Sequence, residues 1–414
     1  MVCLLIFITL VAIMKRTRLF REFFKSEKAG GFLLIFATLL SLVLANSVAG
    51  STYLKIWNVN LGGHPLLHWI NDGMMTIFFL LIGLELEREI YTGELSDLRK
   101  ASFPVFAALG GMLIPAGIYL MLNFGTNTSS GAGIPMATDI AFAIGILSLL
   151  GSRVPASLKI FLTALAVIDD LGAILVIAVF YTATLSSIDF FIALGIFGVL
   201  LLLNKLKVHN LIPYLAGGFV MWYFMLHSGV HATITGVLLA FAIPFGSGDK
   251  KSPSYILQHF LHKPVAFLIL PIFALANTCL LLNGNLMDGM TQPHSLGIIL
   301  GLVLGKPLGI GLFSFVAVGL GWSVLPKGLK WKNILGAGLL GGIGFTMSIF
   351  ITLLAFDKVV FIQQAKIAIL SASAVAGLIG FIWLKITSKS DKTNRRSAIR
   401  IKDSAIKEME PLID

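Results

Sequence analysis

The chain has 414 residues, of which 57% are hydrophobic and only 12% charged, and its mean hydropathy is +0.92. A soluble domain of this length needs far more surface charge, so the composition excludes a soluble globular protein and indicates a membrane protein. The formal net charge of +11 could suggest nucleic-acid binding, but the distribution of the charges along the chain argues against it.

Residues 1–29 are expected to form a cytoplasmic N-terminal segment. The first fourteen residues are apolar, too short to span a bilayer, and lack a basic start and a small-residue cleavage site. A cleaved signal peptide is therefore not expected. Either Met14 is the true start, which leaves 1–13 untranslated, or the segment is an extra interfacial element.

Residues 30–387 are expected to form one transmembrane domain, because a membrane helix needs about 20 apolar residues. Two of the expected spans, 210–226 and 229–245, are short. Residues 388–414 are charged, low in aromatic residues and expected to be a disordered cytoplasmic tail. Hydropathy predicts an all-α polytopic protein with twelve spans: 30–48, 66–90, 101–123, 131–150, 156–181, 188–204, 210–226, 229–245, 256–282, 295–320, 333–355 and 361–386.

Lysine and arginine gather in alternate gaps between these spans. The basic pairs Arg99–Lys100, Lys205–Lys207 and Lys250–Lys251 are separated by gaps with almost no basic residues, such as 123–133. Cytoplasmic loops of membrane proteins carry this excess of basic residues. The alternation places both termini in the cytoplasm and requires an even number of spans.

Segment 49–63 combines strand-forming residues with Gly62 and Gly63, which predicts a small external hairpin. Two later spans contain helix-breaking residues. Span 131–150 begins with two glycines and Pro135, and span 333–355 holds five glycines between 336 and 344. Such interruptions inside a membrane are tolerated where the freed backbone groups are buried or line a cavity, and a matching pair indicates a transporter site.

Four charged residues lie within otherwise apolar spans: Asp139, Asp169, Asp170 and Lys306. Each costs about 2.5–3.5 kcal/mol at the bilayer centre on insertion scales. An ion pair that only stabilises the fold would need one acid beside Lys306. The presence of two adjacent aspartates therefore predicts that at least one of them takes part in the function. Neighbours on a helix diverge by about 100°, which lets one acid pair with Lys306 while the other faces water. Sodium ions and protons would then compete for the carboxylate oxygens, and the two acids are expected to titrate as a coupled pair.

Charges inside membrane spans also occur in proteins with three other functions. A passive cation channel also uses acid rings, but paired acids with a buried lysine favour coupled exchange. An intramembrane aspartyl protease needs aspartates that face each other, which neighbours on one helix do not. A transporter of a larger solute would need an aromatic or arginine cluster. A metal site at His64, His68 and Asp72, or at His259 and His262, is disfavoured against ordinary span ends.

At these residues the sequence resembles the NhaA family of sodium/proton antiporters, from about Phe20 to about Lys385. Seven stretches carry the resemblance in order: NDGMMTIFFLLIGLELEREI (71–90), GIPMATDIAFAIGIL (133–147), LKIFLTALAVIDDLGAILVIA (158–178), HSGVHATITGVLLAFAIP (227–244), LILPIFALANT (268–278), GKPLGI (305–310) and GGIGFTMSIFI (341–351). The resemblance implies inverted repeats, formed by spans three to five and ten to twelve, with spans 4 and 11 broken and crossing at the midplane. It also implies a homodimer built through the 49–63 hairpin.

The resemblance further implies a role for each charge. Asp169 and Asp170 match the pair that binds the cation and carries protons, with Asp170 the more direct sodium ligand. Thr138 and Asp139 match the unwound part of the fourth helix, where the acid offsets facing positive helix ends. Lys306 matches the lysine that offsets the opposing negative ends and pairs with Asp169.

A second set of residues matches positions implicated in pH activation: Asp72, Glu85, Arg88, Glu89 and His231. Many family members carry a glutamate where this chain has Gln258, which cannot titrate. On the residues alone, the 85–89 group is also consistent with a solvated helix end.

The sequence therefore predicts a pH-regulated, electrogenic antiporter in a bacterial inner membrane rather than an enzyme. Its expected partners are sodium, lithium, protons and the lipid bilayer, with no cofactor and no nucleic acid.

Overall fold

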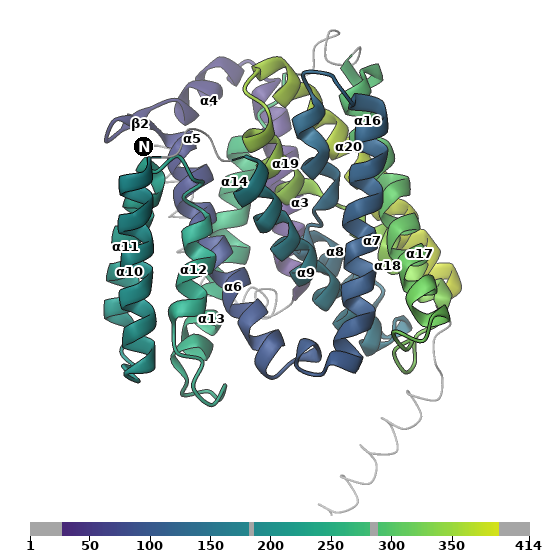
Figure 1. The fold of residues 1–414 in the computed structure, drawn as a ribbon. Helices are drawn as coiled ribbons and strands as arrows, with labels where there is room; N and C mark the ends of the chain where they lie inside the picture. The colour runs from purple at the N-terminus through teal and green to yellow at the C-terminus, as the bar shows by residue number, and fades with distance from the viewer. Residues whose placement is uncertain (1–26, 182–185, 282–288, 389–414) are drawn as a thin grey trace, which may run out of the picture.

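A computed structural model describes residues 27–181, 186–281 and 289–388 (Figure 1). Most of the expected N-terminal segment 1–29 and nearly all of the expected tail 388–414 lie outside these described residues. Within them the chain is almost entirely helical, with one two-stranded sheet.

Eight helical stretches are long and apolar enough to cross a membrane, or up to ten if each of two bent helix pairs counts as one span. The single stretches are Leu66–Tyr91, Ala101–Asn123, Ser129–Leu149, Ala156–Phe180, Ser187–Lys205, Pro253–Asn277, Pro293–Gly319 and Val359–Thr387. The bent pairs are Ala29–Ala45 with Gly50–Trp57, at 120°, and Trp331–Gly341 with Phe345–Ala355, at 47°. The chain is thus a polytopic helical membrane protein.

The two spans expected to be short correspond to short helices. Helix α11 covers Leu211–His227 and α12 covers Ile234–Ala242. The latter has nine residues, which is too few to cross a hydrocarbon core alone. The total of twelve spans therefore stays a prediction.

The remaining elements that position the site follow in chain order. They are α3 (Glu27–Ala45), α4 (Gly50–Trp57), β1 (Asn60–Leu61), β2 (His64–Pro65), α5 (Leu66–His68), η1 (Trp69–Met74), α6 (Met75–Tyr91), η2 (Glu94–Ser96), α7 (Leu98–Asn123), η3 (Ser129–Met136), α8 (Ile140–Leu149), η4 (Gly151–Arg153), α9 (Ala156–Phe180), α10 (Ser187–Lys205), α13 (Pro253–Pro264), η5 (Val265–Ile269), α14 (Leu270–Asn277), η6 (Gly289–Thr291), α16 (Pro293–Leu300), η7 (Gly301–Gly305), α17 (Lys306–Gly319), α18 (Trp331–Gly341), α19 (Phe345–Ala355) and α20 (Val359–Thr387).

Two of the long stretches contain a π-helical turn just before a proline. The turn η5 precedes Pro271, and η7 precedes Pro307. Proline lacks an N–H and its ring clashes with the carbonyl four residues earlier. A wider turn relieves that clash, and π-turns occur often at functional positions. The η7 turn ends immediately before Lys306.

Helices α7 and α17 approach each other at two glycines. A Cβ atom on Gly110 would lie only 2.1 Å from the Gly309 carbonyl oxygen, and one on Gly309 would lie 2.0 Å from that of Gly110. Only glycine allows backbones this close. The contact holds α17, which begins at Lys306, firmly against α7.

The segment expected to form a hairpin does so only in part. Asn60 pairs with Pro65 and Leu61 with His64, and the turn places Gly62 and Gly63 at φ +59° and +92°. Residues Gly50–Trp57 were expected to be strand-like but form α4. The Tyr53 hydroxyl of this helix donates to Ser41 Oγ and to the Leu275 carbonyl oxygen, so tertiary contacts outweigh the local strand preference.

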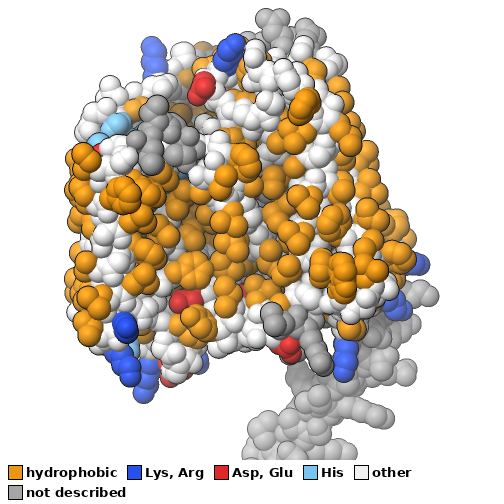
Figure 2. All heavy atoms as spheres, in the orientation of Figure 1, with side chains coloured by type: hydrophobic (Ala, Val, Ile, Leu, Met, Phe, Trp, Pro, Cys, Tyr) orange, Lys and Arg blue, Asp and Glu red, His pale blue; other side chains and the backbone are white. Residues whose placement is uncertain are grey.

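Hydrophobic side chains cover the visible face of the protein from end to end (Figure 2). Lysine and arginine side chains gather at the two ends of this apolar surface and are absent from the middle of the face that Figure 2 shows. This is the surface that a bilayer requires.

Candidate functional site

Asp169 and Asp170 lie side by side in the middle of α9, and neither has any exposed surface. Helix α9 contains no other charged residue beyond Lys159 near its start. Because successive helix positions diverge by about 100°, the two carboxylates have different neighbours. The structure distinguishes them sharply.

Asp169 forms a buried ion pair with Lys306. Lys306 Nζ lies 2.5 Å from Asp169 Oδ2 and donates a second hydrogen bond of 2.9 Å to Thr138 Oγ1. The Thr138 hydroxyl donates to Asp169 Oδ2 at 2.8 Å and also lies 2.9 Å from the Gly341 carbonyl oxygen. A buried pair is stable only when further hydrogen bonds compensate its desolvation, and Thr138 supplies them.

Asp139 lies at the interruption of the fourth predicted span and caps two helices. Its Oδ1 accepts from the Phe142 backbone N–H at the start of α8, at 3.0 Å. Its Oδ2 accepts from the Thr346 backbone N–H at 3.1 Å and from the Thr346 hydroxyl at 2.6 Å, in the first turn of α19. A carboxylate is stabilising at a helix N-terminus, and here one carboxylate serves two.

The two interrupted spans are joined directly through their backbones. The Asp139 N–H donates to the Ile343 carbonyl oxygen at 2.6 Å, between α18 and α19. Thr138 reaches Gly341, and Asp139 reaches Thr346. The unwound residues of each span thus satisfy the polar groups of the other, as buried backbone requires.

Three carboxylate oxygens in this region are buried and have no hydrogen-bond partner among the described residues: Asp169 Oδ1, Asp170 Oδ1 and Asp170 Oδ2. Buried carboxylate oxygens are normally satisfied, so such a group needs an explanation. Oxygen ligands suit hard cations, and a proton on either acid would serve as well. These oxygens therefore fit a small cation or protons as cargo. Within the described chain, Asp170 has two oxygens without a partner, and Asp169 has one.

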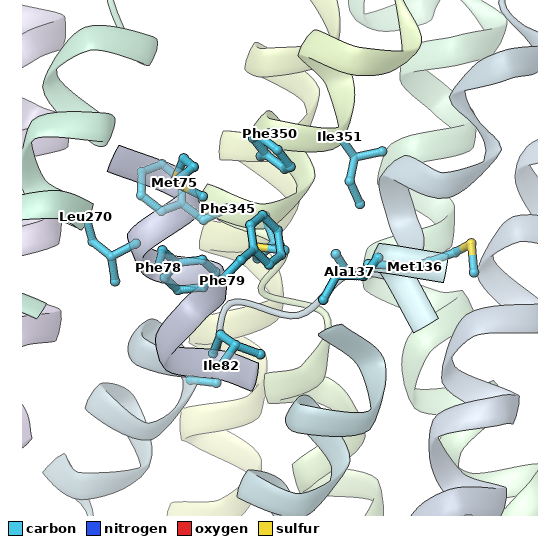
Figure 3. Close-up of a cluster of buried hydrophobic side chains, with 14 of the residues drawn as sticks. Met75, Phe78, Phe79, Ile82, Met136, Ala137, Leu270, Phe345, Phe350 and Ile351 are labelled. Atoms are coloured by element: carbon cyan, nitrogen blue, oxygen red, sulfur yellow. The ribbon is translucent and has the colours of Figure 1, made fainter. Parts of the chain in front are cut away.

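An apolar cluster surrounds the interruptions (Figure 3). It draws on α6, α14, α19 and the link after η3, and includes Met75, Phe78, Phe79, Ile82, Met136, Ala137, Leu270, Phe345, Phe350 and Ile351. Several of its members also line one of two cavities, Phe78, Ile82 and Leu270 the larger and Phe350 the smaller.

The larger cavity, of about 600 Å³, opens at one end of the protein. Phe78, Ile82 and Leu270 of the apolar cluster line its deep part, together with Val167 of α9. Val167 lies one helical turn before Asp170, so the cavity reaches to within a turn of that carboxylate without exposing it.

The polar residues of the larger cavity include most of the predicted pH-regulating group: Glu85, Arg88 and Glu89. Arg88 donates to Gln258 Oε1 at 3.3 Å and lies over the Tyr255 ring. The residue that departs from the family pattern thus contacts the predicted group directly.

Asp72 and His231 lie elsewhere. Asp72 pairs with His68 at 3.0 Å and lines a second cavity of about 240 Å³. His231 Nε2 lies 2.8 Å from the Tyr181 carbonyl oxygen, beyond the end of α9. No group of three or more metal-binding residues occurs among the described residues, so neither histidine set gains support as a metal site.

Sequence reasoning missed three polar residues that the structure places in or near the buried region. Thr346 completes the Asp139 cap. Lys366 is buried in α20 and reaches Asn277 Oδ1 at 3.5 Å. Glu87 is 3% exposed on α6. Lys366 could have been found, because the next charged residue in the predicted span 361–386 is Lys385 near its end, whereas Glu87 is hidden by its charged neighbours.

The chain matches the family model described as Na+/H+ antiporter 1 over residues 21–384. A relative from Flavobacterium psychrophilum, named Na(+)/H(+) antiporter NhaA, is 66% identical over 377 residues, covering 91% of this chain and 98% of the relative. Relatives of the same name from Cytophaga hutchinsonii and Dechloromonas aromatica are 60% and 59% identical, and the matches cover 92% and 91% of this chain and 98% of each relative.

Proposed function

The chain belongs to the Na+/H+ antiporter 1 family, and we propose that it exchanges cytoplasmic sodium or lithium ions for external protons by competition at Asp169 and Asp170. Membership in this family confirms the resemblance seen in the sequence and makes the chain a transporter rather than an enzyme. This excludes the hypothesis of an intramembrane protease. It also favours antiport over the hypothesis of a passive cation channel.

The observation that carries the proposed mechanism is the asymmetry of the two acids. Asp169 is held by Lys306 and Thr138, whereas both oxygens of Asp170 are buried without a partner among the described residues. A bare buried carboxylate is costly, so Asp170 must bind either a proton or a cation. The two ligands exclude each other, which couples their movements.

Asp169 joins the competition through Lys306. A sodium ion at Asp170 attracts the second carboxylate and weakens its pair with Lys306; a departing ion restores the pair. Thr138 contacts the same Asp169 oxygen and can supply a further ligand oxygen. Because one monovalent ion displaces protons from two coupled acids, the exchange moves net charge and is electrogenic.

The interrupted spans supply the moving part. We place them, as the family architecture implies, at the crossing of two inverted repeats made by spans three to five and ten to twelve. Asp139 offsets the facing helix N-termini, and Lys306, through Thr138, offsets the facing C-terminal ends. Rocking of this crossed unit would expose Asp170 alternately to the larger and the smaller cavity.

The larger cavity is assigned to the cytoplasmic side of a bacterial inner membrane, with both termini on that side. Lys159 and Lys263 line it, in keeping with basic residues on the cytoplasmic face. Glu85, Arg88 and Glu89 would regulate the exchange by pH from this cavity, with Asp72 and His231 acting from the opposite end. The hairpin around Asn60–Pro65 would join two copies as a homodimer.

The test is ion-dependent proton flux in everted membrane vesicles that contain the protein. Sodium or lithium added to vesicles with an imposed pH gradient should collapse the gradient, and potassium should not. Short-circuiting the membrane potential with valinomycin and potassium should speed the exchange if it is electrogenic. Absence of a sodium or lithium response from mildly acid to alkaline pH would refute the proposal.

A further inference from the structure

The smaller cavity contains an ion pair that the exchange mechanism does not use. His68 Nδ1 lies 3.0 Å from Asp72 Oδ2, and the two side chains are 28% and 20% exposed. Both residues line this cavity of about 240 Å³, next to Pro65 of the hairpin. The hairpin strand β2 and helix α13, which contains Lys263, lie at opposite ends of the protein (Figure 1).

The pair is held on a distinctive piece of backbone. Asp72 lies in the π-helical turn η1, and its carbonyl oxygen accepts from Thr76 Oγ1 at 2.5 Å. The His64 ring stacks on His68 with 4.5 Å between centroids. The Nε2 atom of His68 is enclosed and has no hydrogen-bond partner among the described residues. The Asp72 carboxylate faces the other ring nitrogen of His68, Nδ1.

The other elements around the pair contribute little charge. Helix α19 faces the cavity with Phe350, Leu353 and Leu354, which do not titrate. Helix α4, which packs against α5, contributes the exposed Lys55. Behind Asn71, the amide of Asn277 bridges to the buried Lys366, and Cys279 follows on the same segment. Among the described residues that line the cavity, His68 and Asp72 are the ones that titrate, with His64 stacked on His68.

The smaller cavity also borders the apolar cluster. Phe350 forms part of its wall, and the Phe350 ring packs against Phe79 with 5.4 Å between centroids. Both rings belong to the apolar cluster around the interrupted spans (Figure 3). The smaller cavity therefore shares a wall residue with that cluster.

We propose that His68 and Asp72 form a proton-binding site at the outer mouth, through which external pH controls the return of sodium into the protein. This inference rests on the proposed function and its orientation. With His68 protonated, the pair is neutral. With His68 neutral, Asp72 leaves one negative charge in a narrow mouth, and such a charge raises the local concentration of cations. Histidine titrates near pH 6.5, within the range that an external medium covers.

The direction of the effect follows. External acid cancels the negative charge and hinders sodium from re-entering on the side where protons are taken up. This reinforces outward sodium transport when protons are plentiful outside. The competition at Asp170 gives a pH dependence of its own, so the test must separate the two contributions by side and by variant.

The experiment uses right-side-out proteoliposomes in which the external sodium concentration for half-maximal sodium uptake is measured against external pH at fixed internal pH. In the unchanged protein this concentration should rise steeply as the external pH falls. In His68→Gln the rise should be smaller by about threefold at acid external pH, the size of a partly exposed ion pair. The dependence on internal pH should be unchanged.

Two further variants complete the design. Asp72→Asn should lower sodium uptake at alkaline external pH, because the negative charge at the mouth is lost, and adding His68→Gln to it should remove the external pH dependence that His68 still contributes. His259→Gln, an exposed histidine at the other end, should match the unchanged protein. Thermal stability in detergent checks that each variant is folded.

The proposal is overturned if folded His68→Gln keeps the full external pH dependence, or if it alters the internal and external dependences equally. A lack of any sodium-driven proton flux in the unchanged protein would instead refute the proposed function. The two failures are therefore distinguishable in one set of vesicles.

Discussion

Lys306 Nζ lies 2.5 Å from Asp169 Oδ2, whereas the oxygens of the adjacent Asp170 have no hydrogen-bond partner among the described residues. Of two identical side chains one position apart, one therefore has a positive charge and hydrogen bonds beside it and the other has neither within the described part of the chain. One is compensated by a lysine that lies 137 positions away in the sequence. The other has no such compensation from any described residue, which fits its proposed role as the ligand of the transported cation or proton.

Replacing Asp170 with asparagine should reduce sodium-driven proton flux to background while the protein still inserts and folds. An amide cannot take up and release a proton at neutral pH, so the competition disappears. Flux in everted vesicles and the amount of folded protein in the membrane are the measurements. Asp189→Asn, which alters a carboxylate near the start of α10, should retain exchange. Normal exchange in Asp170→Asn would remove that residue from the mechanism.

Replacing Lys306 with alanine should lower stability and shift the pH dependence of exchange. Breaking one side of a buried ion pair typically costs about 3–5 kcal/mol, because the remaining charge is uncompensated. Asp169 would then have to bind a proton or another cation. Thermal unfolding in detergent and flux against pH test this, with Lys306→Arg as the charge-conserving comparison. If neither stability nor pH profile changed, the pairing would have no functional weight.

Because Asp139 caps two helices, variants of Asp139 and of Thr346 should lose different amounts of stability. Asp139→Ala should cost about 1 kcal/mol for each of the two helix ends it caps. Thr346→Val should lose only the hydroxyl part, since the backbone N–H of residue 346 can still donate to Asp139. The free energy of unfolding should therefore be clearly lower for Asp139→Ala than for Thr346→Val. Equal losses in the two variants would contradict the double cap.

Helix α7 offers a matched pair of glycines for testing the α7–α17 contact. A methyl group at Gly110 would lie 2.1 Å from the Gly309 carbonyl oxygen, whereas one at Gly117 meets nothing within 4 Å. Gly110→Ala should therefore destabilise the protein by roughly 1–3 kcal/mol, as overpacking does. Gly117→Ala should be neutral or slightly stabilising, because alanine favours helix. Similar melting temperatures for both variants would show that the helices can move apart freely.

Much of this protein is determined by its sequence alone, because the properties concerned are local. Apolar runs long enough to span a bilayer place the long helices, and glycine and proline clusters place the interruptions at 137–139 and 342–344. The isolated charges Asp139, Asp169, Asp170 and Lys306 stand out because charge in an apolar run is costly wherever it occurs. Family membership follows from the same residues.

Other features depend on which distant residues meet, and only the tertiary structure decided them. Asp72 and Glu85 lie on one helical stretch and matched one regulatory group, yet the 12 residues between them carry them to different cavities. Segment 50–57 has strand-forming residues but folds as a helix, because Tyr53 finds partners on two other helices. Hydropathy and spacing do not distinguish two adjacent acids. Which of them pairs with Lys306 is decided by packing between segments far apart in the sequence, and the structure shows that it is Asp169.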